Sequence, residues 1–298
     1  MNNPFIVTSD IHLCSKRPLC RLEEDWISTQ CNYLKFVASM CSKYDCRLII
    51  AGDITDKPKD FNIELLNRAS DIFDTIPEIN VISGNHDIVT NNNGTFDRTV
   101  FKILCKMTKT MKHLCYESKD NVHYIDFIKD NNAWMQKVSE CNSDIAIIHK
   151  FVYYRPEDNH VHDETSSADN ILKAFPNTKL IIAGDNHRGF IYKKGNQTLL
   201  NCGVLFRDTA DLIDYKPQIY YIDENANVTP IPVPIDKDAI TNTYILKEQE
   251  RKQKEEVFIK TILSNKNVSI DFKKNLYNII DKLDCECYIK ETCERILL

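Results

Sequence analysis

Aspartate, asparagine and histidine side chains occur in five short motifs along this 298-residue chain, each after an apolar run. In chain order the motifs are Asp10-Ile11-His12, Gly52-Asp53-Ile54-Thr55-Asp56, Gly84-Asn85-His86-Asp87, His149 and Gly184-Asp185-Asn186-His187. Oxygen and imidazole groups are ligands for divalent metal ions. The apolar runs are typical of buried strands, and functional groups of open α/β sheets lie beyond the carboxyl ends of strands. The pattern therefore predicts a pocket for two metal ions at several strand ends.

Glycine directly precedes a proposed ligand at Gly52, Gly84 and Gly184, in a chain that has only seven glycines. Glycine allows sharp turns and a close approach between backbone and ligand. Ordinary turns between strands and loops also favour Gly, Asp and Asn, so a set of unrelated turns is the alternative interpretation. Five motifs in this order, each after an apolar run, favour the metal site.

The five motifs resemble those of the calcineurin-like metallophosphoesterases over about residues 4–232. Within that family, the likeness is greatest to SbcD-type DNA repair exonucleases, especially their compact phage-encoded forms. Segments Ser9–Leu13, Arg17–Arg21, Asn201–Arg207 and Thr209–Asp214 carry this second likeness. The resemblance implies an α/β fold in which two packed mixed β-sheets are flanked by helices, as a four-layer α/β/β/α sandwich, with a short C-terminal helical tail.

The resemblance also implies a role for individual residues. Seven metal ligands divide into three for one ion, three for the other and one that bridges both: Asp10, His12 and His187; Asn85, His149 and Asp185; and Asp53. Two such ions, roughly 3.5–4 Å apart, produce a bridging hydroxide that attacks a phosphate ester. His86 is then the general acid for the leaving oxygen, and Asp87 orients it or fixes its tautomer. A structural turn histidine is the alternative for His86.

The fifth motif departs from the family pattern, because Asp185 stands where the family has a first histidine. A third ligand carboxylate makes the centre less positive, and oxygen ligands favour hard ions. We therefore expect two Mn²⁺ ions, with Mg²⁺ as the alternative, and low activity with Zn²⁺. A second site that is weak and fills only when substrate is present is a competing interpretation.

The residues next to the motifs bear on the substrate. Phosphoprotein phosphatases carry arginines directly after the second and third motifs, where this chain has Lys57 and Ile88. Without bidentate arginines a dianionic monoester loses a partner, so a phosphodiester is favoured. We expect basic residues near the pocket to contact phosphate groups: Arg17 and Arg21 beside Lys16, and Arg207. Solvated loop charge is the alternative for the first group.

Three functions fit these motifs. The first is a DNA nuclease with exonuclease and endonuclease activity, acting on single strands or duplex ends. The second is a small-molecule or cyclic-nucleotide phosphodiesterase, and the third is a non-catalytic scaffold with the same fold. The net charge of −5 argues against a broadly basic surface, but bound divalent cations would supply positive charge where the phosphate lies.

The elements that position the motifs follow from hydrophobic periodicity. Apolar strands and helices alternate through the first 90 residues, which favours a largely parallel sheet. Helices are predicted at 22–44, 61–75 and 96–112. Short strands are predicted at 122–127, 133–138, 144–149, 179–183, 190–193, 198–202 and 218–222. This density of strands predicts a second sheet packed on the first.

Three prolines between Pro230 and Pro234 cannot continue a helix or a central strand. We therefore predict a catalytic domain at 1–235 and a helical tail at 236–298. By resemblance, the tail helices are a docking site for an SMC-like ATPase of SbcC type, although packing against their own domain is the alternative. A homodimer is also compatible with the sequence.

The remaining features concern environment and minor metal sites. The sequence has no apolar run long enough to cross a membrane, and we do not expect a signal peptide. The twelve cysteines are therefore expected to be reduced in a cytoplasmic protein. Cys285, Cys287 and Cys293 could form a zinc site, with packing on a helix face as the alternative. His160, His162 and Asp163 could bind a third metal ion, with an exposed loop that binds no metal as the alternative.

Overall fold

The computed structural model describes residues 3–155, 164–236, 239–243 and 251–258. The chain divides into two compact units, Met1–Ile240 and Thr241–Leu298. In the second unit residues 251–258 are helical. Residues 237–238, 244–250 and 259–298 of the predicted tail lie outside the described residues. The two minor metal sites, at His160, His162 and Asp163 and at Cys285, Cys287 and Cys293, also lie outside them.

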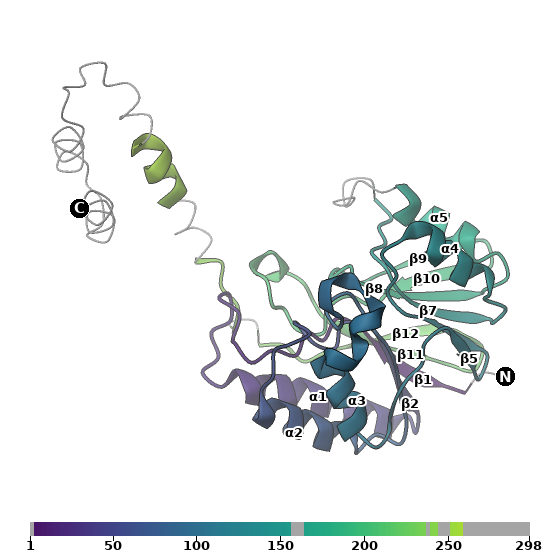
Figure 1. The fold of residues 1–298 in the computed structure, drawn as a ribbon, viewed down its shortest axis with the longest axis horizontal. Coiled ribbons are helices and arrows are strands. Elements are labelled where there is room, and N and C mark those ends of the chain that lie inside the picture. The colour runs from purple at the N-terminus through teal and green to yellow at the C-terminus, as the bar shows by residue number, and fades with distance from the viewer. Residues whose placement is uncertain (1–2, 156–163, 237–238, 244–250, 259–298) are drawn as a thin grey trace. The chain divides into compact units, whose positions relative to one another are not determined.

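The first sheet of unit 1 has six strands in the order β12-β11-β1-β2-β3-β4 (Figure 1). Their bounds are β12 Val228–Pro232, β11 Gln218–Ile222, β1 Phe5–Thr8, β2 Arg47–Ala51, β3 Ile79–Ile82 and β4 Met111–His113. Strands β1 to β4 are parallel, and β11 and β12 are antiparallel to their neighbours. The parallel strands all end at the same edge of the sheet.

The second sheet also has six strands, in the order β5-β6-β7-β8-β10-β9. Their bounds are β5 Glu117–Lys119, β6 Val122–Ile125, β7 Ile145–His149, β8 Leu180–Gly184, β10 Gln197–Asn201 and β9 Phe190–Lys194. The four central strands are parallel, and the edge strands β5 and β9 are antiparallel. Both sheets are therefore mixed, as predicted.

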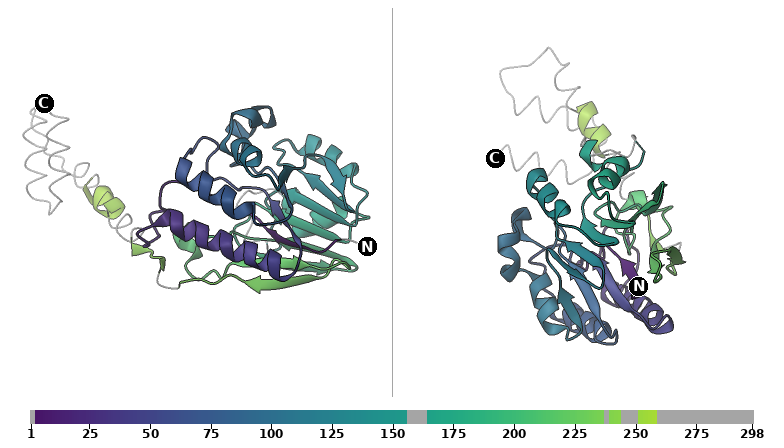
Figure 2. Two further views of the ribbon diagram at one scale, coloured as in Figure 1. Left: turned by 90° about the horizontal axis from the view of Figure 1, so that it is seen from below. Right: turned by 90° about the vertical axis from the view of Figure 1, so that its right-hand side faces the viewer.

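The described residues of unit 1 form five α-helices, which cover the outer faces of the sheets (Figure 1, Figure 2). On the first sheet lie α1 Trp26–Lys43, α2 Ile63–Phe73 and α3 Val100–Met107; on the second lie α4 Asn131–Ser139 and α5 Ala168–Ala174. Short 3₁₀ helices occur at Val89–Asn91, Asn93–Arg98, Glu164–Ser166 and Ala210–Leu212. Helix α1 begins where the Asp25 carboxylate accepts a hydrogen bond from the Ser28 amide, which satisfies one of the amides left free at a helix start.

The layers follow from the alternation of side chains along each strand. In β1, Ile6 packs in the core beneath α1 to α3, whereas Phe5 and Val7 pack in the core between the two sheets. In β8, Ile182 faces the other sheet and Ile181 faces α4 and α5. Three apolar cores thus separate four layers, and the predicted α/β/β/α sandwich is confirmed.

Several predicted elements differ from the structure. Residues 133–138, predicted as a strand, lie in helix α4, because the Asp130 carboxylate caps it by accepting from the Ala133 amide and because Trp134 and Val138 are buried one turn apart. The predicted helix at 96–112 is a 3₁₀ turn, α3 and the short strand β4. Strands β4 and β5 and helix α5 were not predicted.

The proline-rich segment is also different from its prediction. Pro230 and Pro232 lie within β12, opposite Tyr220 and Gln218 of β11. Strand β12 is at the edge of the sheet, where a residue without an amide hydrogen costs no ladder bond on the open side. The first unit therefore extends through this strand to Ile240, somewhat beyond the predicted boundary at 235. No helix among the described residues has the length and apolar character to span a bilayer.

Candidate metal centre

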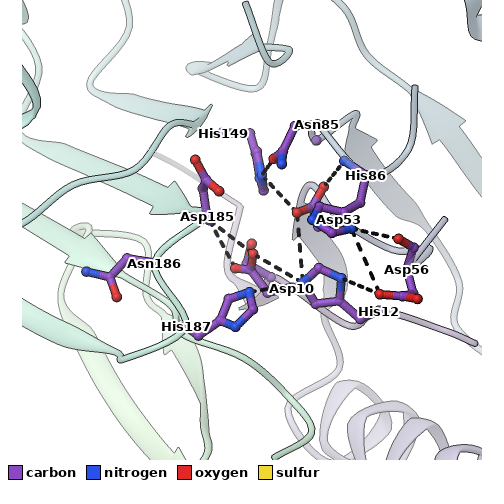
Figure 3. Close-up of polar contacts among 12 residues, drawn as sticks. Asp10, His12, Asp53, Asp56, Asn85, His86, His149, Asp185, Asn186 and His187 are labelled. Atoms are coloured by element: carbon purple, nitrogen blue, oxygen red, sulfur yellow. Dashed lines mark hydrogen bonds and ion pairs between the residues drawn. The ribbon is translucent and has the colours of Figure 1, made fainter. Parts of the chain in front are cut away.

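The predicted ligands come together at the ends of parallel strands from both sheets (Figure 3). Asp10 and His12 follow β1, Asp53 follows β2, and Asn85 follows β3, while His149 ends β7. The pair Asp185 and His187 follows β8. The two sheets are joined there, because the Ala51 carbonyl of β2 accepts hydrogen bonds from Ser9 Oγ at 2.9 Å and from His149 Nδ1 at 2.8 Å.

One group of potential ligands consists of Asp10, His12 and His187, whose ligand atoms lie within 4.8 Å of one another. The Nε2 atoms of His12 and His187 are 3.2 Å apart, although these residues are 175 positions apart in sequence. The carboxylate of Asp10 accepts the backbone amide of Asp185 at 3.1 and 3.2 Å. This group matches the three ligands predicted for the first ion.

A second group consists of Asp10, Asp53 and His149. His149 Nε2 lies 3.3 Å from Asp53 Oδ2 and 3.0 Å from Asn85 Oδ1. Because a carbonyl can only accept, the contact with Ala51 requires the proton on His149 Nδ1. A neutral His149 therefore has its free lone pair on Nε2, directed at Asp53 and Asn85.

Asp53 lies between the two groups and is 1% exposed. Its Oδ1 accepts the His86 amide at 2.9 Å, while Oδ2 is 3.8 Å from His12 Nε2 as well as near His149. One oxygen is thus fixed by the backbone and the other faces both histidines. This position is the one required of the predicted bridging ligand.

Asp185 has a less direct place in the centre. Its backbone holds Asp10, and its carboxylate points to the side of His149 and Asn85 (Figure 3). Burial raises the pKa of Asp185. Its carboxylate is in none of the four compact groups of ligand atoms among the described residues, so its role as a ligand remains a prediction.

The electrostatics of the centre suit cations. Burial raises the pKa of Asp10 to about 7 and lowers the pKa of His12 to about 3. Within the described residues, Asp10 and Asp53 form ion pairs only with histidines, and the buried His12 Nδ1 has no hydrogen-bond partner. Buried charges require pairing or coordination. These residues therefore fit a pair of divalent ions.

The backbone at the centre adopts an uncommon conformation. Three of the predicted ligands, Asp10, His12 and Asp53, have φ between 49° and 51°, and Asp185 has φ of 85°. Left-handed conformations are unfavourable for residues other than glycine, at a cost of about 1–3 kcal/mol each. Such strain concentrates at functional sites because the surrounding structure holds it in place. Four of the eleven non-glycine residues with positive φ in the described part of the chain are predicted ligands, and all four are aspartate or histidine, which adopt this conformation more often than most residues.

The glycine of the third motif gives a testable prediction. A Cβ at Gly84 would lie 2.0 Å from Asp53 Oδ1 and 2.6 Å from the Asp53 amide nitrogen. Because that nitrogen is backbone, Gly84→Ala must displace Asp53, and we expect unfolding to become easier by about 1–3 kcal/mol. Chemical denaturation measures this change. Gly94→Ala, whose Cβ would approach only the end of the Asn92 side chain at 3.2 Å, should change stability by less than about 1 kcal/mol. Equal effects of the two changes would contradict the prediction.

His86 lies at the rim of the centre, with 41% of its side chain exposed. Its Nδ1 donates to the backbone carbonyl of Asp56 at 2.6 Å, and its ring meets that of His12 edge to face at a centroid distance of 4.7 Å. Burial lowers the pKa of His86, but Asp53 and Asp56 outweigh burial and raise it overall. A fixed, partly exposed imidazole of this kind can deliver a proton to a substrate.

The predicted orienting role of Asp87 is wrong. Asp87 is fully buried, and its carboxylate accepts the amides of Gly84 at 2.9 Å, Ile54 at 3.3 Å and Thr55 at 2.9 Å, and the Thr55 hydroxyl at 2.9 Å. It therefore fastens the loop after β3 to the loop after β2. The backbone carbonyl of Asp56 orients His86 instead. Any residue at position 56 could make this contact, so the sequence holds no signal for it.

Two arginines predicted to contact phosphate are buried. Arg21 is 1% exposed, forms an ion pair with Glu23, donates to the Arg207 carbonyl at 3.2 Å and lies over the Trp26 ring. Arg207 is 2% exposed and donates to the Ile213 carbonyl at 2.9 Å. Both guanidinium groups hold loops together, which corrects the prediction that they bind substrate.

Arg17, by contrast, is exposed, as is Lys16 beside it. One nitrogen of the Arg17 guanidinium donates to the Glu23 carbonyl. Both residues belong to the loop that follows the ligand His12. Their predicted contact with a nucleic-acid backbone is compatible with this exposure and remains a prediction.

A family model described as calcineurin-like phosphoesterase matches residues 3–189, a segment that contains all five motifs. No curated protein matches the chain. An archaeal phosphodiesterase of known structure aligns with 10% identity and a TM-score of 0.40, over 77% of this chain and 99% of its own. A putative 5'-nucleotidase from Staphylococcus aureus, in complex with alpha-ketoglutarate, aligns with 15% identity and a TM-score of 0.48, over 84% of this chain and 58% of its own.

Proposed function

Because the chain belongs to the calcineurin-like phosphoesterase family, we propose that it is a phosphodiesterase that uses two divalent metal ions to cleave DNA. The observation that carries the proposal is the position of Asp53 between two groups of imidazole and carboxylate ligands. A bound pair of divalent ions would supply Lewis-acid charge to a phosphoryl group and activate water for an in-line displacement.

Different residues of the centre would bind the two ions and supply the proton for the leaving group. Asp10, His12 and His187 would hold one ion, and His149 and Asn85, with Asp185 beside them, would hold the other. Asp53 would contact both. His86, fixed by the Asp56 carbonyl, faces the open side of the centre, where it would hold a proton for the leaving oxygen.

The residues around the centre support a diester rather than a monoester. Ile88 is buried and Lys57 is exposed, and neither offers the planar pair of donors with which arginine binds a terminal phosphate. The buried Arg21 and Arg207 are engaged in structural contacts. The exposed Lys16 and Arg17 are available to a polymer backbone at the rim, which supports DNA as the substrate.

Metal identity gives the second testable prediction. We expect cleavage of single- and double-stranded DNA to be greatest with Mn²⁺, lower with Mg²⁺ and lowest with Zn²⁺, because Asp185 adds oxygen to the ligand set. The assay compares the three ions at equal concentration, with a cyclic nucleotide as a parallel substrate. Asp53→Asn is the control for contaminating nuclease.

Other results of this assay would point to a different metal preference or a different function. Greatest activity with Zn²⁺ would contradict the argument from Asp185. Cleavage of the cyclic nucleotide without cleavage of DNA would identify a small-molecule phosphodiesterase instead. Binding of Mn²⁺ without hydrolysis of either substrate would favour the scaffold. The SbcD-type classification, the ATPase partner and the homodimer remain predictions of the sequence.

A further inference from the structure

Three donor side chains of different chemistry meet beside the loop that carries Asn85 and His86. They are His113, Cys115 and Asp126, and one ligand atom from each lies within 4.8 Å of the others. His113 ends β4, Cys115 follows two residues later, and Asp126 comes directly after β6. The cluster therefore connects the edge strand of the first sheet to the second sheet. None of the three belongs to the five motifs.

Two of the three donors are already held in place. The His113 ring stacks on Phe96, with centroids 4.4 Å apart, and meets Phe101 edge to face at 5.4 Å. Its Nε2 lies 3.0 and 2.9 Å from the two oxygens of Asp126. Asp126 is 3% exposed, and its Oδ1 accepts the Ser83 amide at 2.8 Å. The imidazole and the carboxylate are thus fixed before any ligand arrives.

Cys115 is the third potential ligand of the cluster. Residues two apart on an extended chain point to the same side, so Cys115 accompanies His113 while Leu114 between them is buried in the core between the sheets. Cys115 is exposed. An ion could therefore enter from solvent and keep one coordination position for water.

We propose that His113, Cys115 and Asp126 form a separate mononuclear site for Zn²⁺ or a metal of similar preference. Nitrogen, thiolate and carboxylate donors are those that Zn²⁺ uses, at bond lengths of about 2.0–2.3 Å. Tetrahedral bonds of this length place nitrogen and oxygen donors roughly 3.3–3.5 Å apart, so His113 and Asp126 need to separate by only a few tenths of an ångström. On binding, the Cys115 thiol loses its proton to solvent and forms the sulfur–metal bond. The neutral His113 ring, whose Nε2 donates to Asp126 before binding, shifts its proton from Nε2 to Nδ1, so that the lone pair on Nε2 can bind the metal.

The site would differ from the neighbouring centre in both metal and role. The predicted ligands of the centre are nitrogen and oxygen atoms, whereas this cluster has a sulfur, which selects against Mn²⁺ and Mg²⁺. Asp126 holds the amide of Ser83, directly before Gly84 and Asn85. An ion bound to Asp126 would therefore hold the start of the loop that carries His86, as a structural ion.

Co²⁺ is the probe that distinguishes this site, because a thiolate–cobalt bond has a charge-transfer absorption that nitrogen and oxygen ligands do not produce. Metal-free full-length chain is titrated with CoCl₂, and the near-ultraviolet band is followed. We expect one equivalent to produce the band and Zn²⁺ to remove it by competition. In Cys115→Ser the band should be absent, with a loss of affinity at least as large as the roughly 10–100-fold caused by losing an outer-shell partner.

Cys105→Ser is the matched control, since Cys105 lies nearby in sequence, in α3, but outside the cluster. It should keep the band of the original chain. A band that persists in Cys115→Ser, or no band in a chain whose circular dichroism shows it to be folded, would overturn the proposal. The readout requires no hydrolysis, so its result is independent of the proposed nuclease activity.

Discussion

Asp53→Asn is expected to abolish metal-dependent hydrolysis. The Asp53 carboxylate is the group shared by the two sets of ligands, with Oδ2 3.3 Å from His149 Nε2 and 3.8 Å from His12 Nε2. An amide carries no charge and presents only one oxygen, so it cannot neutralise and join two cations. We expect kcat/KM to fall well beyond the roughly 100-fold that loss of an outer-shell partner causes. Initial rates at saturating Mn²⁺ measure this.

The same change should leave the fold intact. The side-chain oxygen of the substituted asparagine can still accept the His86 amide that Asp53 Oδ1 accepts at 2.9 Å. Without metal, the change removes the repulsion between Asp53 and the buried Asp10, but it also removes the stronger attraction between Asp53 and His149, which helps to lower the pKa of Asp53. Thermal unfolding without metal should therefore occur at a somewhat lower temperature than in the original chain. The stabilisation by Mn²⁺, which follows from binding to the folded state alone, should be lost.

The rate of hydrolysis and the melting temperature together distinguish loss of the metal site from loss of the folded structure. Hydrolysis at near-normal rates in Asp53→Asn would contradict the two-metal centre. A large drop in melting temperature without metal would instead show that Asp53 is needed for folding, and the rate loss would then say nothing about the bridge. Asp60→Asn offers a matched change at a half-buried aspartate that accepts hydrogen bonds from the Ser15 amide and hydroxyl, and it should retain activity.

His86→Asn is expected to lower kcat on DNA by about 10²–10⁴-fold, the usual contribution of a general acid. His86 Nδ1 is held by the Asp56 carbonyl, and 41% of the side chain is open to solvent. The free Nε2 can then approach a leaving oxygen. Mn²⁺ binding, followed by thermal shift, should remain, because the His86 side chain is not among the predicted ligands.

Substrates with different leaving groups show whether His86 is a general acid or has only a structural role. A p-nitrophenyl diester releases a stable anion that needs no proton, so its hydrolysis should lose far less in His86→Asn than the hydrolysis of DNA. Equal losses on both substrates would contradict the assignment of His86 as the acid. They would favour the alternative in which the residue only shapes the turn.

The sequence was sufficient for the features that are encoded locally. The strands before Asp10, Asp53 and His149 are apolar runs whose character does not depend on distant residues. In parallel strands of one sheet the carboxyl ends lie at one edge, so motifs that follow such strands must meet. The α/β/β/α fold and the family were therefore predictable, together with the residues that gather at the centre.

The hydrogen-bond partners and the burial of individual side chains were decided only by the tertiary structure. Asp87 is adjacent to His86 in sequence, yet it binds amides of another loop, and Asp56 orients His86 instead. Arg21 and Arg207 carry the charge expected at a phosphate site, but their neighbours bury them.

The same reason explains the elements that the sequence did not reveal. Residues 133–138 have apolar positions compatible with strand or helix, and the Asp130 cap together with the core beneath α4 selects the helix. The cluster of His113, Cys115 and Asp126 depends on the meeting of strands from two sheets. Local sequence specifies residue types and periodicity, whereas hydrogen-bond partners and burial depend on contacts between segments far apart in the chain.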